Sequence, residues 1–433
     1  MLFSIVLMYR RFLALAEASP GSPAVVEATD GKITTRADLL ARAEAVGSTI
    51  HEGELIPIQL PNSADFVATI LAVMRRGAVA MLIDRDASDA EVARITGHFG
   101  RRPKLPAGAR VIKLTSGSTG TPRGIVTSEE NLLADCENIC RSMGIGPEDV
   151  NFGAIPLSHS YGFSNLVTPL ITQGTPLVIS NSYLPQTIID YCNQYHCTVM
   201  PGIPMMFDHL ASTDRADGSF ETVRLFISAG APLPGSTSRR FRERFGKSIH
   251  SFYGCSECGG ITYDREGGGV ERGTVGSAMD GVKLSTRGAR LIVHSAAAAL
   301  GYLNDSSKFE KFTSGKFVTD DLAEMRDGNV YLTGRVSDLI NIAGKKVNPR
   351  EIEQVILQIE GVRQVKVYGE PAGARGEVVA AAIVANPGVT REAVRAFCQE
   401  RLSSHKVPRI VKLIDAMPVD DRGKITRSAL AEL

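Results

Sequence analysis

The sequence predicts a protein of the α/β class, with a large multi-layer N-terminal domain that contains a β-rich part and a small C-terminal α/β domain. Three observations support this prediction. Helix-like and strand-like patterns alternate up to residue 245, as they do in a mostly parallel sheet. Glycine-rich, short alternating runs over 267–331 indicate β hairpins. Beyond residue 335 the alternation of helix and strand resumes in a separate unit, so we expect domains at 1–335 and 336–433.

Hydrophobic periodicity predicts the elements of the N-terminal domain in order. Apolar residues at helical spacing predict helices at 36–50, 64–76, 129–143 and 183–196. Short apolar runs predict strands at 55–60, 78–83, 111–114, 177–179, 198–200 and 223–228. A break at 230–234 then precedes a basic helix that ends near Phe245.

In the β-rich part, Asp327-Gly328 is a typical hairpin turn, and 335–350 has the composition of a connector. For the small domain the same periodicities predict helices at 350–359 and 390–404 and strands at 364–368, 378–385 and 410–414.

Composition indicates the broad class. The chain has 433 residues, which suggests two or three domains of roughly 150 residues each. A hydrophobic content of 43% is typical of soluble globular proteins, and a net charge of +1 gives no field that would attract nucleic acid. Seven cysteines, an odd number without a secretory pattern, favour reduced thiols and a cytoplasmic location. No apolar run approaches the length of about 18 residues that a membrane span needs, and the apolar residues 1–8 are expected to pack against the body.

A hydroxyl- and glycine-rich stretch at 113–126 follows the strand predicted at 111–114. Gly117, Gly120 and Gly124 allow positive φ angles and close approach of the backbone to an anion, and Arg123 adds a fixed positive charge. Hydroxyl donors are contributed by Thr115, Ser116, Ser118 and Thr119. The stretch matches neither the P-loop nor the dinucleotide-binding pattern, so it is a phosphate-binding loop of another kind or, alternatively, a surface linker.

A second motif lies at 251–262. Tyr253, Gly254, Ser256 and Glu257 place an aromatic ring, a flexible glycine, a hydroxyl and a carboxylate close together. Such a set could stack on a purine, approach a phosphate and hold Mg²⁺, which prefers one or two carboxylates beside phosphate oxygens. The alternative is that Cys255 and Cys258, spaced C-x-x-C, form a redox or zinc pair, although no second pair or nearby histidine cluster accompanies them.

Two further motifs complete a set of four. They are Tyr331-Leu-Thr-Gly-Arg335 followed by Asp338, and Gly423-Lys424-Ile-Thr-Arg427 near the C-terminus. In this order the four motifs resemble those of the adenylate-forming superfamily, which includes acyl- and aryl-CoA synthetases, the adenylation domains of peptide synthetases, and luciferases. The resemblance spans nearly the whole chain and implies that the small C-terminal domain is mobile.

The resemblance implies an ATP site. The β- and γ-phosphates would be wrapped by Thr115, Ser116, Gly117, Ser118, Thr119 and Gly120, with Arg123 where the family usually has lysine. The adenine would lie between Tyr253 and a wall made of Gly230, Ala231 and Pro232. Ser256 would contact the α-phosphate, and Glu257 would hold Mg²⁺. Asp321 and Arg335 would take the ribose hydroxyls, and the alternative for these two residues is a surface ion pair.

The resemblance also implies an acid site and a thiol site. His159 would orient the substrate carboxylate, and Cys258, Gly259 and Gly260, together with 202–206, would edge the acyl pocket. Residues 161–164 offer no carboxylate for a substrate ammonium, which disfavours an amino acid. Lys424 would move to the α-phosphate with the small domain, and Gly344 would lie against the pantetheine of the acceptor.

The predicted function is therefore that of an acid–thiol ligase. ATP and Mg²⁺ would activate a fatty or aryl acid as acyl-AMP, and the acyl group would pass to the thiol of coenzyme A. Two alternatives stay open: an acyl-AMP ligase that loads a pantetheinylated carrier protein, and a degenerate nucleotide-binding protein without turnover. A homodimer is compatible with the sequence. Two departures from the family, the short stretch 87–110 and Ser337 at the hinge, could alter dimerisation or domain rotation.

Overall fold

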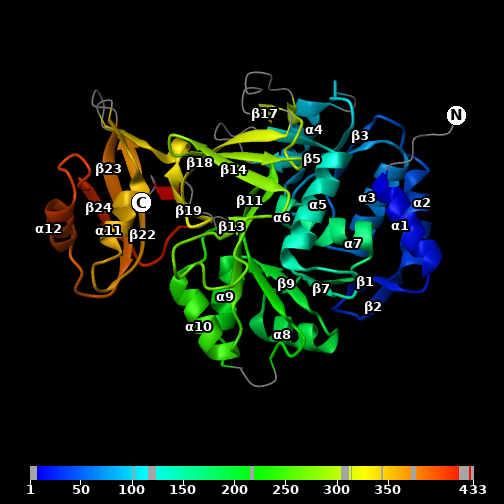
Figure 1. The fold of residues 1–433 in the computed structure, drawn as a ribbon, viewed down its shortest axis with the longest axis horizontal. Coiled ribbons are helices and arrows are strands. Elements are labelled where there is room, and N and C mark those ends of the chain that lie inside the picture. Colours follow the sequence, from blue (N-terminus) through cyan, green and yellow to red (C-terminus); the bar gives the residue numbers. More distant parts are fainter. Residues whose placement is uncertain are drawn as a thin grey trace. The chain divides into compact units, whose positions relative to one another are not determined.

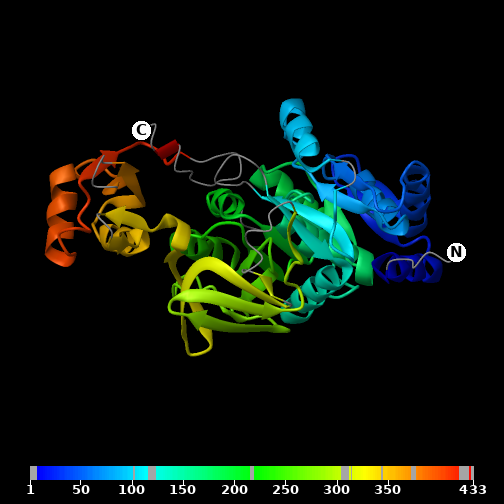
Figure 2. The ribbon, with the colours of Figure 1, turned by 90° about the horizontal axis from the view of Figure 1, so that it is seen from above.

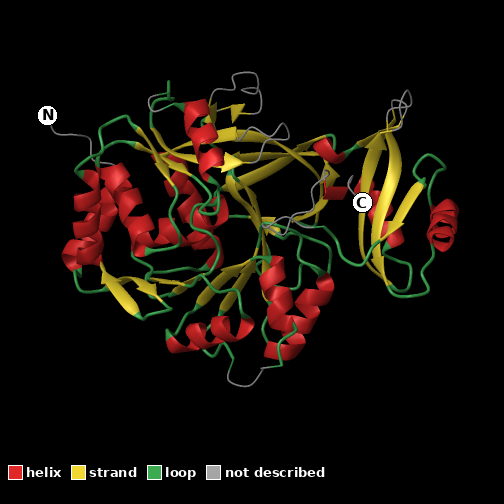
Figure 3. Ribbon diagram, turned by 180° about the vertical axis from the view of Figure 1, so that it is seen from behind, coloured by secondary structure: helices red, strands yellow, loops and turns green. Residues whose placement is uncertain are grey.

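The computed structural model describes residues 7–100, 103–115, 123–214, 219–303, 312–313, 315–342, 345–371, 377–418 and 429–430. Helices and strands are mixed throughout, as Figure 3 shows, so the predicted α/β class is confirmed. The chain divides into two compact units. The first comprises Met1–Ser285, Ile292–Val318 and Arg326–Val330, and the second comprises Thr286–Leu291, Thr319–Met325 and Tyr331–Leu433.

A mostly parallel sheet forms the centre of the first unit. Nine consecutive strands of its linear order lie entirely in this unit, in the order β13-β12-β11-β10-β9-β7-β8-β1-β2, and β17, which pairs with β18, also lies in it. The neighbours from β11 through to β1 all pair in parallel, as the alternation of helix and strand predicts. The bounds are β1 Pro23–Glu27, β2 Lys32–Thr35, β7 Asn151–Gly153, β8 Leu177–Ile179, β9 Val199–Gly202, β10 Leu225–Ser228, β11 Ile249–Cys255, β12 Gly259–Tyr263 and β13 Ser277–Ala278.

A second sheet of the first unit has the order β16-β6-β5-β4-β3. Strands β3 to β5 are parallel, whereas β6 pairs antiparallel with both β5 and β16. The strand β6 was not predicted from the sequence. The bounds are β3 Leu55–Ile58, β4 Val79–Leu82, β5 Ala109–Thr115, β6 Arg123–Ser128 and β16 Gly301–Leu303.

The helices of the first unit cover these sheets. Helices α1, α2 and α3 contact one another near the N-terminus (Figure 1, Figure 2), and α1 was not predicted. Met8 and Phe12 on α1 are fully buried, which confirms the expected packing for Met8, while residues 1–6 lie outside the described part. The bounds are α1 Leu7–Ala18, α2 Arg36–Gly47, α3 Ala64–Arg75, α4 Asp89–Phe99, α5 Glu129–Met143, α6 Ser160–Gly162, η1 Phe163–Val167, α7 Thr168–Gln173, α8 Pro185–Gln194, α9 Pro204–Ala211 and α10 Gly235–Phe245.

The second unit contains its own small core. Its antiparallel and parallel pairs give the sheet β22-β23-β24, and α11 contacts both β22 and α12. Ile352, Ile383 and Val394 are fully buried between them. Strands β14, β15, β18 and β19 contribute residues to both units. The first-unit strand β17 spans Phe312–Thr313. The other bounds are β14 Val282–Arg287, β15 Arg290–Ser295, β18 Lys316–Arg326, β19 Asn329–Arg335, η3 Val336–Asp338, β20 Ile340–Ile342, β21 Lys345–Val347, α11 Pro349–Ile356, β22 Val362–Pro371, β23 Glu377–Ala385, α12 Arg391–Arg401 and β24 Ile410–Leu413.

Within the ranges given above, no helix combines the length and the apolar character that crossing a lipid bilayer requires.

Candidate functional site

The two ends of the hydroxyl-rich loop face each other across a β hairpin. Thr115 ends β5, Arg123 begins β6, and the two residues are partners in the antiparallel ladder. The intervening residues Ser116, Gly117, Ser118, Thr119 and Gly120 lie outside the described residues. Gly124 does not have a positive φ angle, contrary to the expectation from sequence. A Cβ atom there would instead lie 3.0 Å from Cγ2 of Ile112, so this glycine permits close packing.

The second motif forms a tight connection between β11 and β12. The N–H of Cys258 donates to the carbonyl of Cys255, at 3.3 Å, so Ser256 and Glu257 occupy the two central positions of a turn. The hydroxyl of Ser160, at the start of α6, donates a 2.6 Å hydrogen bond to the hydroxyl of Ser256. The turn is therefore tied directly to the segment that follows His159.

Glu257 and Arg123 are linked through an aromatic side chain. The hydroxyl of Tyr302, on β16, donates a 3.0 Å hydrogen bond to Oε1 of Glu257. The guanidinium carbon of Arg123 lies 5.9 Å from the centroid of the same ring, within the range of a cation–π contact. Burial, followed by the Glu257 carboxylate, raises the pKa of the Tyr302 hydroxyl well above its ordinary value, so Tyr302 remains a donor. Arg123 and the carboxylate of the turn thus contact the same side chain, one at the ring and the other at the hydroxyl.

His159 is paired with an acidic residue from a distant part of the chain. Its Nε2 lies 2.9 Å from Oδ2 of Asp84, which follows the carboxyl end of the parallel strand β4. Gly162 on the same segment is required by close approach, because a Cβ atom there would lie 2.2 Å from the carbonyl oxygen of Pro156. The motif at 156–162 therefore folds back on itself and presents the His159 ring beside Asp84.

The residues expected to line adenine lie at the carboxyl ends of the strands in the mostly parallel sheet of the first unit. Ser228 of β10 is in register with Gly202 of β9 and with Ser251 of β11. Gly230 and Tyr253 each come two residues after these paired positions, and Gly230 has a φ of +88°, which favours glycine. Ala231 and Pro232 follow directly. In open parallel sheets this edge is where ligands bind.

A buried carboxylate lies beside the predicted acyl pocket. Asp135 on α5 accepts a 2.6 Å hydrogen bond from the hydroxyl of Ser164 and a 2.9 Å hydrogen bond from the N–H of Gly260. Burial lowers the pKa of Lys113, and the charge of Asp135 opposes that effect. The stretch 161–164 itself contains no acidic residue, as the sequence shows. Helix α5 nevertheless places the carboxylate of Asp135 against this stretch, where it accepts the hydrogen bonds from Ser164 and Gly260.

In the second unit, Asp321 and Arg335 form an ion pair. Nε of Arg335 donates to Oδ1 of Asp321 at 2.6 Å, and the side chains are 57% and 9% exposed respectively. The alternation of β18 explains why Asp321 is buried, because Asp320 points to the other face and pairs with Arg290 at 2.6 Å. The Asp321 carboxylate is therefore buried, so the alternative of an ordinary surface ion pair does not hold for this residue.

Two residues of the predicted site, and the serine that departs from the family pattern at the hinge, have not yet been placed. Gly344 and Lys424 lie outside the described residues. Ser337 is exposed in the single turn η3, where its hydroxyl donates a 3.1 Å hydrogen bond to Asp338.

Several residues of this constellation were not predicted from the sequence. Ser160 contacts Ser256 across 96 positions of the chain. Asp84 contacts His159 across 75 positions, and Tyr302 contacts Glu257 across 45. No local spacing signals such contacts. Ser160 was the one member that could have been found, because it stands directly after His159 in a motif already singled out.

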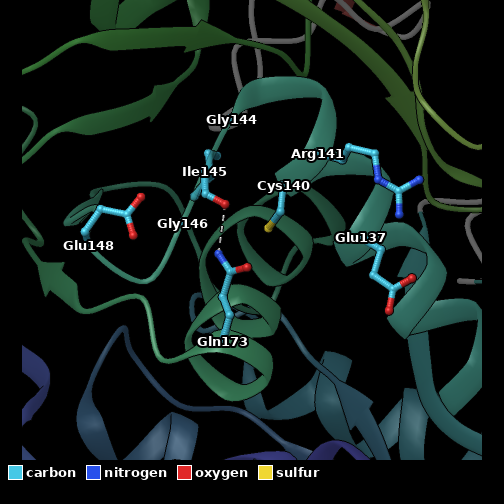
Figure 4. Close-up of a pocket in the computed structure, with 8 residues that line it drawn as sticks. All are labelled: Glu137, Cys140, Arg141, Gly144, Ile145, Gly146, Glu148 and Gln173. Carbon is cyan, nitrogen blue, oxygen red and sulfur yellow. Dashed lines mark hydrogen bonds between the residues drawn. The ribbon is translucent and has the colours of Figure 1, made fainter.

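A pocket of about 410 Å³ lies elsewhere, at the C-terminal end of α5 (Figure 4). The amide of Gln173 crosses it to the carbonyl of Ile145, at 3.1 Å. Its lining shares no residue with the site described above: Glu137, Cys140, Arg141, Gly144, Ile145, Gly146, Glu148 and Gln173. The described ranges hold no group of three or more histidine, cysteine or acidic side chains that could bind a metal by themselves.

Comparison with known proteins defines the class. The family model for the AMP-binding enzymes matches residues 12–105 and 101–288, and the model for the C-terminal domain of AMP-binding enzymes matches residues 351–424. The chain therefore belongs to the AMP-binding enzyme family, within the adenylate-forming superfamily that the motifs resemble.

Curated relatives lie in the same family. The YngI protein of Bacillus subtilis (strain 168) is 30% identical over 350 residues, covering 74% of this chain and 62% of that protein. The 4-coumarate–CoA ligase-like 9 of Oryza sativa subsp. japonica is 25% identical over 98% of this chain and 90% of that protein. The long-chain-fatty-acid–CoA ligase of Escherichia coli O157:H7 is 26% identical over 76% of this chain and 63% of that protein. The match thus spans less than two thirds of the length of YngI.

Solved structures share the fold. ATP-bound MatB from Rhodopseudomonas palustris superposes with a TM-score of 0.84 at 24% identity, over 98% of both chains. The o-succinylbenzoate CoA synthetase MenE from Bacillus subtilis, solved with its acyl-adenylate intermediate, gives a TM-score of 0.83 at 22% identity, over 97% of both chains.

Proposed function

We propose that this protein activates a carboxylic acid with ATP as acyl-AMP and transfers the acyl group to the thiol of coenzyme A. One observation carries the proposal beyond family membership. Arg123 at the end of the hydroxyl-rich loop and Glu257 in the turn beside Ser256 meet at the Tyr302 side chain. A cation, a hydroxyl and a carboxylate are the groups that a nucleotide triphosphate with its metal requires.

The first step is nucleophilic attack by the acid. A carboxylate oxygen of the substrate forms a bond to the α-phosphorus, the bond from that phosphorus to the bridging oxygen breaks, and pyrophosphate leaves. Thr115 and Arg123 would contact the leaving phosphates, and Ser256 would donate to the α-phosphate. No general base is needed, because the attacking carboxylate is already ionised.

The residues around Glu257 fit Mg²⁺. This ion takes one or two carboxylates together with substrate phosphates, and Glu257 is the single acidic residue of the turn. Tyr302 would hold the carboxylate in place through Oε1. The ion, when bound, would neutralise negative charge on the phosphate oxygens.

The acid site favours an uncharged acyl group. His159, oriented by Asp84, would hold the substrate carboxylate. The partly buried ring of Tyr161, two residues further along, lies with its centroid 5.8 Å from that of the buried Phe252 on β11. Asp135 is buried and each of its oxygens already accepts a hydrogen bond, which disfavours it as the partner of a substrate ammonium. Fatty and aryl acids are therefore the proposed substrate class.

The remaining groups would serve the ribose and the acceptor. Asp321 would accept hydrogen bonds from the ribose hydroxyls, Arg335 would donate to them, and Lys424 would supply a second cation to the α-phosphate during adenylation. Gly344 would border the pantetheine of coenzyme A.

Pyrophosphate release tests the first step. The full chain is mixed with ATP, Mg²⁺ and a panel of fatty, aryl and amino acids, and pyrophosphate and AMP are measured without and with coenzyme A. Release with a fatty or aryl acid, and thioester formation only when coenzyme A is present, is the expected result. Acyl-AMP that transfers only to a pantetheinylated carrier protein would favour the carrier-loading ligase. ATP binding without pyrophosphate release from any acid would favour the binding protein.

A further inference from the structure

The two cysteines of the nucleotide motif are placed to react with each other. Their Sγ atoms lie 3.2 Å apart, and the residues that carry them are the first and last of the turn between β11 and β12. A β-turn holds such Cα atoms within about 7 Å, close to the range that a disulfide spans. A disulfide of about 2 Å requires the two sulfurs to approach each other by roughly 1 Å.

Exposure distinguishes the two sulfurs from each other and from the remaining cysteines. All seven cysteines lie in the described ranges, and Cys255 alone among them is partly exposed, whereas Cys258 is fully buried. A partly exposed thiol beside a buried second thiol is the arrangement of an attacking and a resolving cysteine.

We infer that Cys255 and Cys258 form an oxidisable dithiol, in which a small-molecule disulfide such as oxidised glutathione reacts at Cys255 and Cys258 completes a protein disulfide that slows adenylation. The effect on adenylation rests on the proposed function. The formation of the disulfide does not.

The exchange balances in two steps. The sulfur of Cys255, as thiolate, attacks one sulfur of the small disulfide, whose S–S bond breaks and releases one small thiol. The sulfur of Cys258 then attacks Sγ of Cys255, and the second small thiol leaves. The two leaving thiolates take up the two protons that the cysteines lose. Two electrons pass from the protein to the small disulfide.

The position of the pair explains why oxidation should matter for activity. Ser256 and Glu257 are the only residues between the two cysteines. Their contacts to Ser160 and Tyr302 hold the turn in the reduced form. Pulling the sulfurs together shifts the hydroxyl and the carboxylate relative to these partners, and a displacement of about 1 Å at a reacting centre can reduce a rate on the order of 100-fold.

Counting thiols tests the modification without any substrate. The reduced full-length chain is incubated with oxidised glutathione, denatured, and labelled with an alkylating reagent. The number of labelled cysteines should fall from seven to five, and peptide mapping should recover the bridge between Cys255 and Cys258. Cys258→Ser should stop at a mixed disulfide that retains one glutathione, and Cys255→Ser should not react.

The chain contains a matched control pair. Cys136 and Cys140 on α5 have sulfurs 3.9 Å apart, but both are buried. Cys136→Ser should respond to oxidised glutathione as the unmodified chain does. A count that stays at seven, or a bridge at another pair, overturns the inference even if the reduced enzyme is active.

Activity is measured on the same samples. Oxidation should lower pyrophosphate release on the order of 100-fold, and dithiothreitol should restore it. An oxidised protein with an unchanged rate overturns the regulatory part. A reduced protein that releases no pyrophosphate with any acid contradicts the proposed function instead, while the thiol count still decides whether the dithiol exists.

Discussion

The hydroxyl of Ser160 donates a 2.6 Å hydrogen bond to the hydroxyl of Ser256, across 96 positions of the chain. The first residue follows His159 and the second lies in the turn with Glu257. This contact joins the segment proposed to orient the acid with the turn proposed to contact the α-phosphate.

Ser160→Ala should therefore slow adenylation by about 5- to 10-fold, since one neutral hydrogen bond contributes roughly 1 kcal/mol. Ser160 acts here as a positioning residue. Ser160→Thr retains the hydroxyl and should recover most of the rate, which a purely steric role would not predict. The measurement is kcat for pyrophosphate release at saturating acid. Equal rates for the alanine variant and the unmodified protein would contradict the role.

Metal dependence provides the second prediction. Glu257→Gln should raise the Mg²⁺ concentration needed for half-maximal pyrophosphate release, because an amide is a weaker ligand than a carboxylate. Tyr302→Phe removes the hydroxyl that holds Oε1 and keeps the ring beside Arg123, so it should produce a smaller shift in the same direction. Titration of the rate with Mg²⁺ measures both. An unchanged rate of Glu257→Gln at limiting Mg²⁺ would exclude Glu257 as the metal ligand.

Elements with local signals were predictable from the sequence, and long-range contacts were not. Helix α5 was predicted at its observed bounds because Ser128 caps its start and Gly144, in the left-handed conformation, ends it. Strand β6 was missed because Arg123–Ser128 becomes a strand only through pairing with β5 and β16.

The same distinction applies to the site. Motif residues such as Glu257 were located by local composition and by resemblance. Their partners Tyr302, Asp84 and Asp135 were not, because a partner brought by another element has no characteristic spacing.

Asp149 should make the free energy of unfolding depend on pH. Burial would raise the pKa of this carboxyl, but hydrogen bonds from Arg224, from Thr198 and from the Gly146 N–H together hold it below its ordinary value. A pKa that is lower in the folded state stabilises the fold above the unfolded value of about 3.9, and this stabilisation is lost as the pH falls through the folded value.

Asp149→Asn should lower the free energy of unfolding by about 2 kcal/mol at pH 7, since hydrogen bonds to a charged group contribute roughly 1.5 to 3 kcal/mol. The difference from the unmodified protein should shrink at pH 3. Urea unfolding at both pH values is the measurement. Asp280→Asn is the control, because its pair with Arg265 is 38% exposed on both sides and should contribute little. A difference of the same size at both pH values would show that the ionised carboxylate is not the stabilising form.

Lys424 allows the two half-reactions to be separated. A compact ammonium suits the charge that develops on oxygens at the α-phosphorus, and removing one such group typically costs on the order of 100- to 1,000-fold in rate. Lys424→Ala should lose acyl-AMP formation by that order and still convert supplied acyl-AMP to the thioester. Lys412→Ala, which removes an ammonium paired with Glu370, should spare both steps. Equal loss of both half-reactions would remove Lys424 from the proposed adenylation site.

Recognition of the ribose should depend on Asp321 and not on its neighbour. Asp321 is buried on one face of β18 and paired with Arg335, while Asp320 lies on the other face and is paired with Arg290. Replacing the carboxylate by an amide weakens the hydrogen bonds that it accepts from the ribose hydroxyls, because the amide oxygen carries no charge. Asp321→Asn should raise the KM for ATP by about 10-fold or more, as expected for hydrogen bonds to a charged group.

The ligand itself supplies the decisive comparison. The nucleotide 2′,3′-dideoxy-ATP has no 2′- or 3′-hydroxyl that could donate a hydrogen bond to Asp321. Asp321→Asn and the unmodified protein should therefore have similar KM values for it. Asp320→Asn is the matched control one residue away, and it should leave the KM for ATP nearly unchanged because its partner Arg290 is 31% exposed and remains solvated. A loss that is equally large for ATP and for the dideoxy nucleotide would mean that Asp321 supports the fold of β18 and β19. In that case the ion pair with Arg335 would be structural, and the ribose would have to be bound by other residues.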